Sequence, residues 1–283
     1  MMNYKGYQLF YVNGSSHSAG GGLEDETLSP HSSVVTYYRK KYNIEWSVKK
    51  EVAFGHRLSQ IIGIPCVNEA ENGGGLGRVV RMAYAFIEKH WDIKDKIFLI
   101  LEKPEHAFRT EVYYKPFKKF FIVNCQIDYD DKDYKCTLTQ ATPNYQDYNP
   151  NINLVQPVFQ EYLDKHHDYI EHGKSVERSF VGLYSFCKLN GIPIKVMNTP
   201  GEYDLETMMY KEIFDERDLI NLDFAKNSYV NSNIYNWCRT KNLSIAHEIP
   251  EYSDDFHPGY FGHIKYAEQL KPWLDQFLEK NTK

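Results

Sequence analysis

Three separated stretches of the chain carry the residue types used in nucleophilic catalysis. Residues 14–18 (GSSHS) form a small polar segment after a short apolar run, where a serine hydroxyl can act as a nucleophile. Asp254 and His257 stand three residues apart, so the carboxylate can accept the imidazole Nδ1–H and leave Nε2 free as a base. Gly73 and Gly74 precede a helical pattern, and backbone N–H groups at a helix start can face a developing negative charge.

Each stretch also has a purely structural interpretation. A serine in a glycine-rich turn is more often structural than catalytic, a glycine turn can serve tight packing alone, and a lone Asp-x-x-His is usually a polar surface turn. His17 is not expected to be the base, because neighbouring side chains on an extended segment point to opposite sides. The three stretches become a serine-hydrolase constellation only if the fold brings them to one place.

The elements around these stretches predict such a meeting point. Short apolar runs at residues 7–12, 64–68, 96–101 and 192–197 read as strands, and each precedes a helical pattern. The principal helices are expected at residues 51–62, 79–91, 154–190 (with a break near 172–173) and 258–280, and a further strand at 117–125. This alternating order predicts an α/β fold with a mostly parallel sheet and helices on both faces.

One domain is expected to span residues 1–283. Within it, residues 126–152 are rich in Asp, Tyr, Asn and Pro and are predicted to form a long polar insertion. Such a segment is either a surface loop or a lid that helps bind substrate, because long loops in compact domains are often functional.

Composition excludes several classes of function. The formal net charge of −5 argues against a nucleic-acid partner, which requires a basic face. The 5 cysteines are odd in number and lack CxxC spacing, which disfavours a disulfide framework or a zinc site. With scattered histidines and no long apolar run, we expect no metal, no cofactor and no membrane partner. The expected protein is soluble and cytoplasmic; a place in a virion or release by lysis stays open.

The chain resembles the SGNH (GDSL-type) hydrolase family along nearly its whole length. Residues 13–20 (NGSSHSAG) match the block Asn-Gly-x-Ser-x-(Ser/Thr)-x-Gly of one branch. Residues 68–78 (NEAENGGGLGR) match Asn-x-Ala-x-x-Gly-Gly-x-x-x-Arg, and residues 254–258 (DDFHP) match Asp-x-x-His-Pro. Three short motifs in the family's order are more specific than any one of them.

The resemblance implies a single-domain three-layer α/β/α sandwich of flavodoxin-like type. It assigns the nucleophile to Ser16, whose backbone N–H also joins the oxyanion hole. The oxyanion glycine falls on Gly73 or Gly74, and the spacing favours Gly73. His257 is then the general base and later the general acid, with Asp254 as the residue that orients it. A second histidine, His263, is expected to be structural.

One departure concerns the family's third block, which supplies an oxyanion-hole asparagine after the third strand. Here the corresponding residues 101–105 read LEKPE, without an asparagine. Pro104, Arg109 and Glu111 only echo a Ser-Pro-x-Arg-like segment of other branches. The hole would then rest on Ser16 and Gly73, and loss of one donor typically costs about 100- to 1000-fold in rate.

The predicted function is hydrolysis of a carboxylic ester through an acyl-serine intermediate. The resemblance implies small acyl groups, such as acetyl on a carbohydrate, although the residues select neither the substrate nor an oligomeric state. Two alternatives remain open: a binding or structural module with weak or no catalysis, for example in a viral assembly, and an O-acyltransferase that uses the same site.

Overall fold

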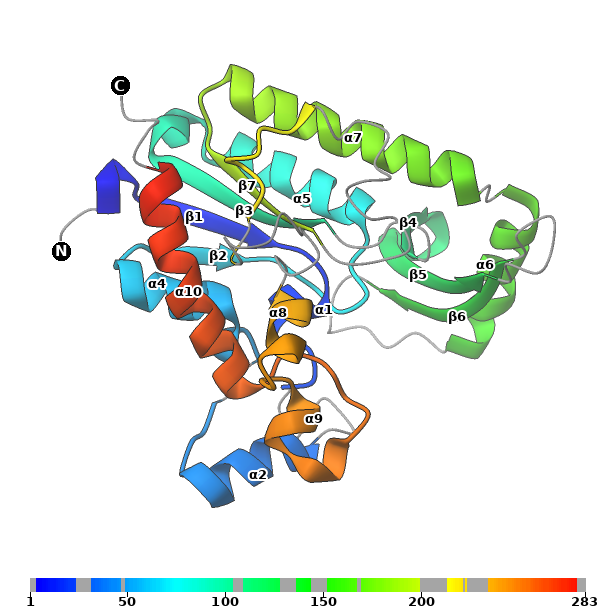
Figure 1. Ribbon diagram of the computed structural model, residues 1–283. Helices are drawn as coiled ribbons and strands as arrows, with labels where there is room; N and C mark the ends of the chain where they lie inside the picture. Colours follow the sequence, from blue (N-terminus) through cyan, green and yellow to red (C-terminus); the bar gives the residue numbers. More distant parts are fainter. Residues whose placement is uncertain are drawn as a thin grey trace.

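The computed structural model describes residues 4–23, 32–46, 49–103, 109–127, 136–143, 152–166, 169–198, 213–220, 222 and 234–278. Four parallel strands form its central sheet in the order β2-β1-β3-β7 (Figure 1). Their bounds are Leu9–Asn13 for β1, Cys66–Asn68 for β2, Ile97–Lys103 for β3 and Ile194–Asn198 for β7. The prediction of an α/β fold with a mostly parallel sheet is confirmed.

Helices cover both faces of this sheet because the strands are apolar on both sides. Tyr11 and Leu99 face α5 (Leu76–Lys89) and α7 (Tyr169–Leu189). Phe10 and Phe98 stack on the opposite face, against α4 (Phe54–Ile62) and α10 (Tyr260–Leu278), where α8 (Ile234–Thr240) also packs. Figure 1 shows α5 and α7 above the sheet, and α4 and α10 below it.

A second, antiparallel sheet of order β4-β5-β6 lies beyond the carboxyl ends of the parallel strands (Figure 1). It consists of β4 (Arg109–Tyr114), β5 (Lys119–Ile127) and β6 (Cys136–Pro143). Helix α6 (Ile152–His166) packs on it, around Phe121 and Phe159. The predicted strand at 117–125 therefore corresponds to β5, whereas β4 was not predicted.

The predicted polar insertion at 126–152 is not simply a loop. It begins inside β5 and contains β6; residues 128–135 and 144–151 lie outside the described part of the chain. The predicted helix break near residues 172–173 is wrong, because α7 runs through both. Instead, α6 ends at His166 and α7 begins at Tyr169.

The smaller elements surround the end of the sheet. They are α1 (Ser16–Ala19), α2 (Ser32–Tyr42), α3 (Lys49–Val52) and α9 (Ile245–Glu248), with 3-10 turns at Tyr4–Gly6, Trp91–Lys96, Lys115–Phe117 and Pro250–Tyr252. An apolar cluster that includes Tyr38 and Trp46 joins α2 to α9. In the described part of the chain, no helix has the length and hydropathy needed to cross a bilayer.

The register of the sheet places the ends of three strands side by side. Asn13, the last residue of β1, is paired with Leu101 of β3, and Val12 is paired with Asn68, the last residue of β2. The chain that leaves β1, the chain that leaves β2 and Glu102 near the end of β3 therefore meet at one carboxyl edge.

Candidate functional site

The turn after β1 places Ser16 at the start of a very short helix. Ser15 is the N-cap residue of α1, and Gly20 ends the helix in the left-handed conformation with φ of 81°. Gly14 lies so close to β3 that a Cβ atom there would be 2.3 Å from Glu102 Oε2 and 2.4 Å from its Cβ. Only glycine fits at this approach, which fixes the direction of the turn.

The three serines of this turn have different surroundings. The hydroxyls of Ser15 and Ser18 each donate a hydrogen bond of 2.6 Å to the carboxylate of Glu102, and both residues have 0% exposure. Ser16 keeps 8% exposure, and its Oγ lies 3.0 Å from His257 Nε2. The predicted nucleophile is therefore the serine whose hydroxyl meets an imidazole.

The opposite side of His257 contacts Asp255. Nδ1 lies 2.8 Å from Asp255 Oδ1, and the same oxygen accepts the backbone N–H of His257 at 3.0 Å. With its proton on Nδ1, the imidazole donates to Asp255 and presents the lone pair of Nε2 to the Ser16 hydroxyl. Ser16, His257 and Asp255 thus form a continuous chain of hydrogen-bonding groups.

The assignment of Asp254 as the orienting residue is wrong. Asp254 is exposed, and its carboxylate lies 3.5 Å from the Ser253 hydroxyl. The physical reason is the local turn: a carboxylate two residues ahead of a backbone N–H can accept it in an Asx turn. Asp255 occupies that position relative to His257, and its side chain is only 13% exposed.

The loop that carries His257 is attached to α9 through its backbone. The N–H of Ile245 donates to the carbonyl of His257 at 2.8 Å, and the N–H of Ala246 donates to the carbonyl of Asp255 at 2.7 Å. These donors belong to the first turn of α9, whose N–H groups have no partner within the helix. The short helix therefore holds both ends of the Asp255–His257 segment.

The glycine turn after β2 packs directly on the serine turn. A Cβ atom on Gly74 would be 2.8 Å from the carbonyl oxygen of Gly14, and one on Gly21 would be 2.7 Å from Ser16 Cβ and 3.1 Å from Asn72 Oδ1. Gly73 has φ of 72°, in the left-handed region. The two turns are thus in van der Waals contact beside Ser16.

The structure separates the two glycines that were predicted for the oxyanion hole. The N–H of Gly74 donates to the carbonyl of Glu71 at 2.9 Å, so this amide is already used within the turn. The assignment of Gly74 as an oxyanion donor is therefore wrong. The N–H groups of Ser16 and Gly73 make no hydrogen bond to any residue that the structure describes, and both stay candidates.

A buried polar network ties the ends of β1 and β2 together beneath the site. Arg78, only 5% exposed, donates from Nη1 to Asn13 Oδ1 at 3.2 Å and to the Glu69 carbonyl at 2.8 Å. Asn13 Nδ2 donates to the Tyr11 hydroxyl, which donates to Glu69 Oε2. Burial, reinforced by Glu69, raises the pKa of Tyr11. The arginine of the second sequence block thus fixes the two turns relative to each other.

Glu102 is a residue of the site that was not predicted. Its carboxylate is buried and accepts hydrogen bonds from the N–H and hydroxyl of Ser15 and from the hydroxyl of Ser18. Burial alone raises the pKa of Glu102, but its hydrogen-bond donors, His17 first, outweigh burial and hold the pKa below its usual value. A charged residue at the end of an otherwise apolar strand was the available signal.

His17 points toward Glu102, with Nδ1 3.2 Å from Oε1. Burial lowers the pKa of His17, which favours a neutral ring that donates from Nδ1. Its ring centroid lies 4.6 Å from that of Tyr235 and 5.5 Å from that of His257. The expected extended conformation of this segment is wrong, because His17 belongs to the short helix α1. Its Nδ1 nevertheless lies against the Glu102 carboxylate.

His263 lies in the interior, as expected for a structural residue. It is 0% exposed, and its Nδ1 accepts the backbone N–H of Phe54 at 3.1 Å. Burial, with a smaller contribution from Arg57, lowers the pKa of His263 to about 3. This imidazole is therefore neutral at ordinary pH and joins α10 to the start of α4.

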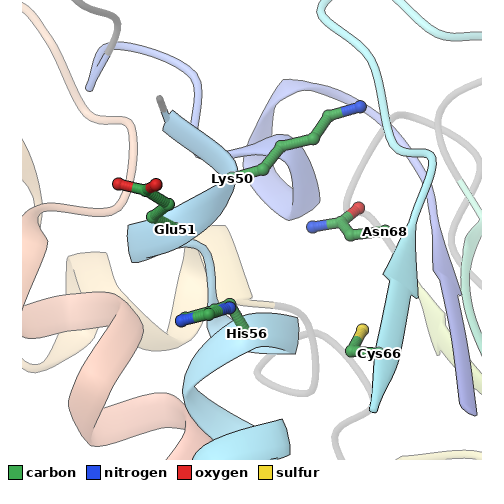
Figure 2. A pocket seen from close by; sticks show the side chains of 5 residues that line it. All are labelled: Lys50, Glu51, His56, Cys66 and Asn68. Atoms are coloured by element: carbon green, nitrogen blue, oxygen red, sulfur yellow. The ribbon is translucent and has the colours of Figure 1, made fainter. Parts of the chain in front are cut away.

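A pocket of about 250 Å³ lies between β2 and the helices α3 and α4. It is lined by Lys50, Glu51, His56, Cys66 and Asn68 (Figure 2). Asn68 Nδ2 donates to the carbonyl of Ser18 at 3.0 Å, which connects the pocket wall to the turn. Burial raises the pKa of Cys66, so its thiol is protonated and is a poor nucleophile.

The structure describes only part of the segment that corresponds to the family's third block. Pro104 lies outside the described residues; Arg109 begins β4. Glu111 accepts two hydrogen bonds from Arg81 of α5, at 2.7 and 2.8 Å. This bidentate pair links the antiparallel sheet to the helix that follows the glycine turn.

In the arrangement as a whole, a serine hydroxyl, an imidazole and a carboxylate form one line of hydrogen-bonding contacts, and the glycine turn after β2 packs against the turn that carries the serine. Among the residues that the structure describes, no three His, Cys, Asp or Glu side chains gather as a metal-binding group.

In comparisons with known proteins, the chain matches no family model and no curated protein.

Proposed function

We propose that this protein is a serine-dependent ester hydrolase of the SGNH (GDSL) type, with the three-layer α/β/α architecture of that family. The observation that carries the proposal is the line of contacts from Ser16 Oγ through His257 to Asp255, at 3.0 and 2.8 Å. These are hydrogen-bond distances for a nucleophile, its base and the group that orients the base.

The proposed reaction begins when Ser16 Oγ attacks the carbonyl carbon of a carboxylic ester. His257 Nε2 takes the hydroxyl proton, and the carbonyl π electrons move to oxygen, which becomes an oxyanion. The N–H groups of Ser16 and Gly73 are the proposed donors to this oxygen. The carbonyl then reforms, and the alcohol leaves with the proton from His257.

Water completes the proposed cycle by the same steps. His257 removes a proton from water, the hydroxide attacks the acyl-serine, and collapse releases the acid while Ser16 regains its proton. The Asp255 carboxylate stabilises the imidazolium that forms in each half-reaction. The family resemblance supports a small acyl group, such as acetyl on a carbohydrate, as the group that is transferred to Ser16.

The test is ester turnover with a chemical label at the nucleophile. The purified protein would be assayed with p-nitrophenyl acetate and with acetylated sugars, and a fluorophosphonate probe would be located by mass spectrometry. We expect turnover and labelling at Ser16, both lost in Ser16→Ala. Added alcohol that diverted product from free acid to a new ester would favour acyl transfer, whereas no label and no turnover would favour a non-catalytic module.

A further inference from the structure

Strand β5 directs two of its side chains toward the glycine turn. Phe121, Val123 and Cys125 belong to the apolar cluster under α6. The alternate residues Ile122 and Asn124 therefore lie on the other face of the strand. A Cβ atom on Gly73 would be 3.4 Å from Ile122 Cγ2 and 2.8 Å from Asn124 Nδ2. The amide nitrogen of Asn124 is thus placed against Gly73.

The strand is irregular at this residue. The pairing of β5 with β6 shifts register between Asn124 and Cys125, as in a β-bulge. Bulges are common beside active sites, where they redirect a side chain. Asn124 is also the polar residue in the otherwise apolar run of residues 120–125 (FFIVNC), and asparagine is depleted in strands. Both features favour a role for its side chain other than strand pairing.

The neighbouring strand supports this placement. Arg109 of β4 is paired with Asn124, and a Cβ atom on Gly75 would be 2.8 Å from the Arg109 carbonyl oxygen. Both strands therefore contact the glycine turn at this end of the β4–β5 pair, and the glycine turn itself packs on the Ser16 turn through Gly74. Asn124 therefore lies against Gly73, on the side of the glycine turn that faces the antiparallel sheet.

We propose that the Asn124 side-chain amide donates a hydrogen bond to the oxyanion that forms when Ser16 attacks the ester carbonyl. This inference rests on the proposed function. It makes Asn124 a third donor beside the N–H groups of Ser16 and Gly73, while Gly74 is excluded by its bond to Glu71. A primary amide has two N–H donors, so one can bind the protein while the other faces the substrate oxygen.

This arrangement compensates for the asparagine missing after β3. A donor that strengthens its bond only as charge develops on the carbonyl oxygen raises kcat and leaves KM nearly unchanged. Removing one such donor typically lowers kcat by about 100- to 1000-fold. The amide would thus act on the same oxygen as the usual third-strand residue, but from a different sheet.

The experiment compares Asn124→Asp and Asn124→Ala with the wild-type protein. Asparagine and aspartate have nearly the same shape, but the carboxylate has no N–H to donate at neutral pH. The matched control is Asn190→Asp, the same exchange at the far end of α7. Circular dichroism checks folding of each variant, and the Ala variant keeps the test decisive should the Asp variant not fold.

We expect kcat for p-nitrophenyl acetate to fall about 100- to 1000-fold in both Asn124 variants, with KM within about 3-fold of wild type. Affinity for a trifluoromethyl ketone, which forms a tetrahedral adduct with serine, should fall by a similar factor, and Asn190→Asp should match wild type. Folded Asn124 variants with wild-type kcat and ketone affinity would overturn this inference alone. Absence of turnover and of Ser16 labelling in the wild type would overturn the proposed function and this inference together.

Discussion

Replacing Glu102 by glutamine removes the charge that organises the serine turn. The carboxylate Oε2 accepts the Ser15 N–H at 2.9 Å, and Oε1 accepts the Ser15 hydroxyl at 2.6 Å and lies 3.2 Å from His17 Nδ1. In Glu102→Gln, one of these oxygens becomes an NH2 group. If the NH2 group takes the place of Oε2, it faces the Ser15 N–H, which cannot accept a hydrogen bond. If it takes the place of Oε1, it faces the His17 ring N–H, and the Ser15 hydroxyl must rotate to accept from it.

The expected loss of stability follows from these contacts. A hydrogen bond to a charged group contributes about 1.5–3 kcal/mol, and a buried donor left without an acceptor costs about 1–3 kcal/mol. With partial relief from rotation of the hydroxyls, we expect the free energy of unfolding to fall by about 3 kcal/mol. That is a large fraction of the roughly 5–15 kcal/mol that stabilises a typical domain.

The pH dependence has a definite sign. The folded-state pKa of Glu102 lies below its usual value of 4.5, so its stabilising contribution is present above pH 4.5 and is lost as the pH falls below that value. Urea unfolding of the wild type and Glu102→Gln should therefore differ most near pH 7 and converge toward pH 3. Ester turnover should fall by about 100-fold, because a displacement of about 1 Å in a reacting group costs that much.

The matched control is Glu111→Gln, which removes a carboxylate with 8% side-chain exposure from its pair with Arg81 but does not touch the serine turn. It should lower stability and leave most of the turnover. The reasoning about Glu102 is refuted if Glu102→Gln unfolds at the wild-type urea concentration, or if the stability difference does not depend on pH.

Three further changes probe other contacts of the site. Asp255→Asn should lower kcat by about 10,000-fold by favouring the wrong imidazole tautomer, whereas Asp254→Asn should leave kcat within about 3-fold; ester kinetics measure both. Burial raises the pKa of Glu248 to about 7 in the folded protein, so this residue destabilises the fold progressively as the pH rises from 4.5 to 7. Glu248→Gln should therefore gain stability relative to wild type by up to about 3 kcal/mol between pH 5 and pH 8 in urea titrations. Gly75→Ala should lower the unfolding free energy by about 1–3 kcal/mol, because its methyl group would meet the Arg109 carbonyl oxygen at 2.8 Å.

Each of these predictions has an opposing outcome. Equal losses of kcat in the two aspartate variants would remove the distinction between them. Glu251, an exposed carboxylate in the same region, provides a control for Glu248, and a stability difference that is the same at pH 5 and pH 8 would exclude Glu248 as the titrating group. Wild-type stability of Gly75→Ala would mean that β4 does not press on the glycine turn.

The sequence predicted the parallel sheet because its strands are short, apolar runs followed by helical patterns. It predicted that Ser16 and His257 would meet, because motif order and strand ends are properties of the chain itself, and the two side chains do lie 3.0 Å apart. It could not choose between Asp254 and Asp255, since two adjacent carboxylates differ only in the turn they adopt. The Asx turn at Asp255, two residues before the His257 N–H, is visible only in three dimensions.

Long-range contacts account for the other residues that were not predicted. Glu102 is 87 residues from Ser15, and no local pattern shows that its carboxylate turns back under the serines. Asn124 reaches Gly73 through a second sheet that was not predicted as such, because β4 is too polar to stand out as a strand. A charged or amide side chain in an otherwise apolar strand was the signal in both cases.

The contact between Ser16 and His257 can form only late in synthesis of the chain. The two residues are 241 positions apart in the chain. At a translation rate of about 5–20 residues per second, the Ser16 turn leaves the ribosome roughly 10–50 s before its imidazole partner is made. During that interval Glu102, made much earlier than His257, can already hold the turn in place. The nascent chain therefore carries a serine turn whose Ser16 hydroxyl gains its imidazole partner only when the segment with His257 docks.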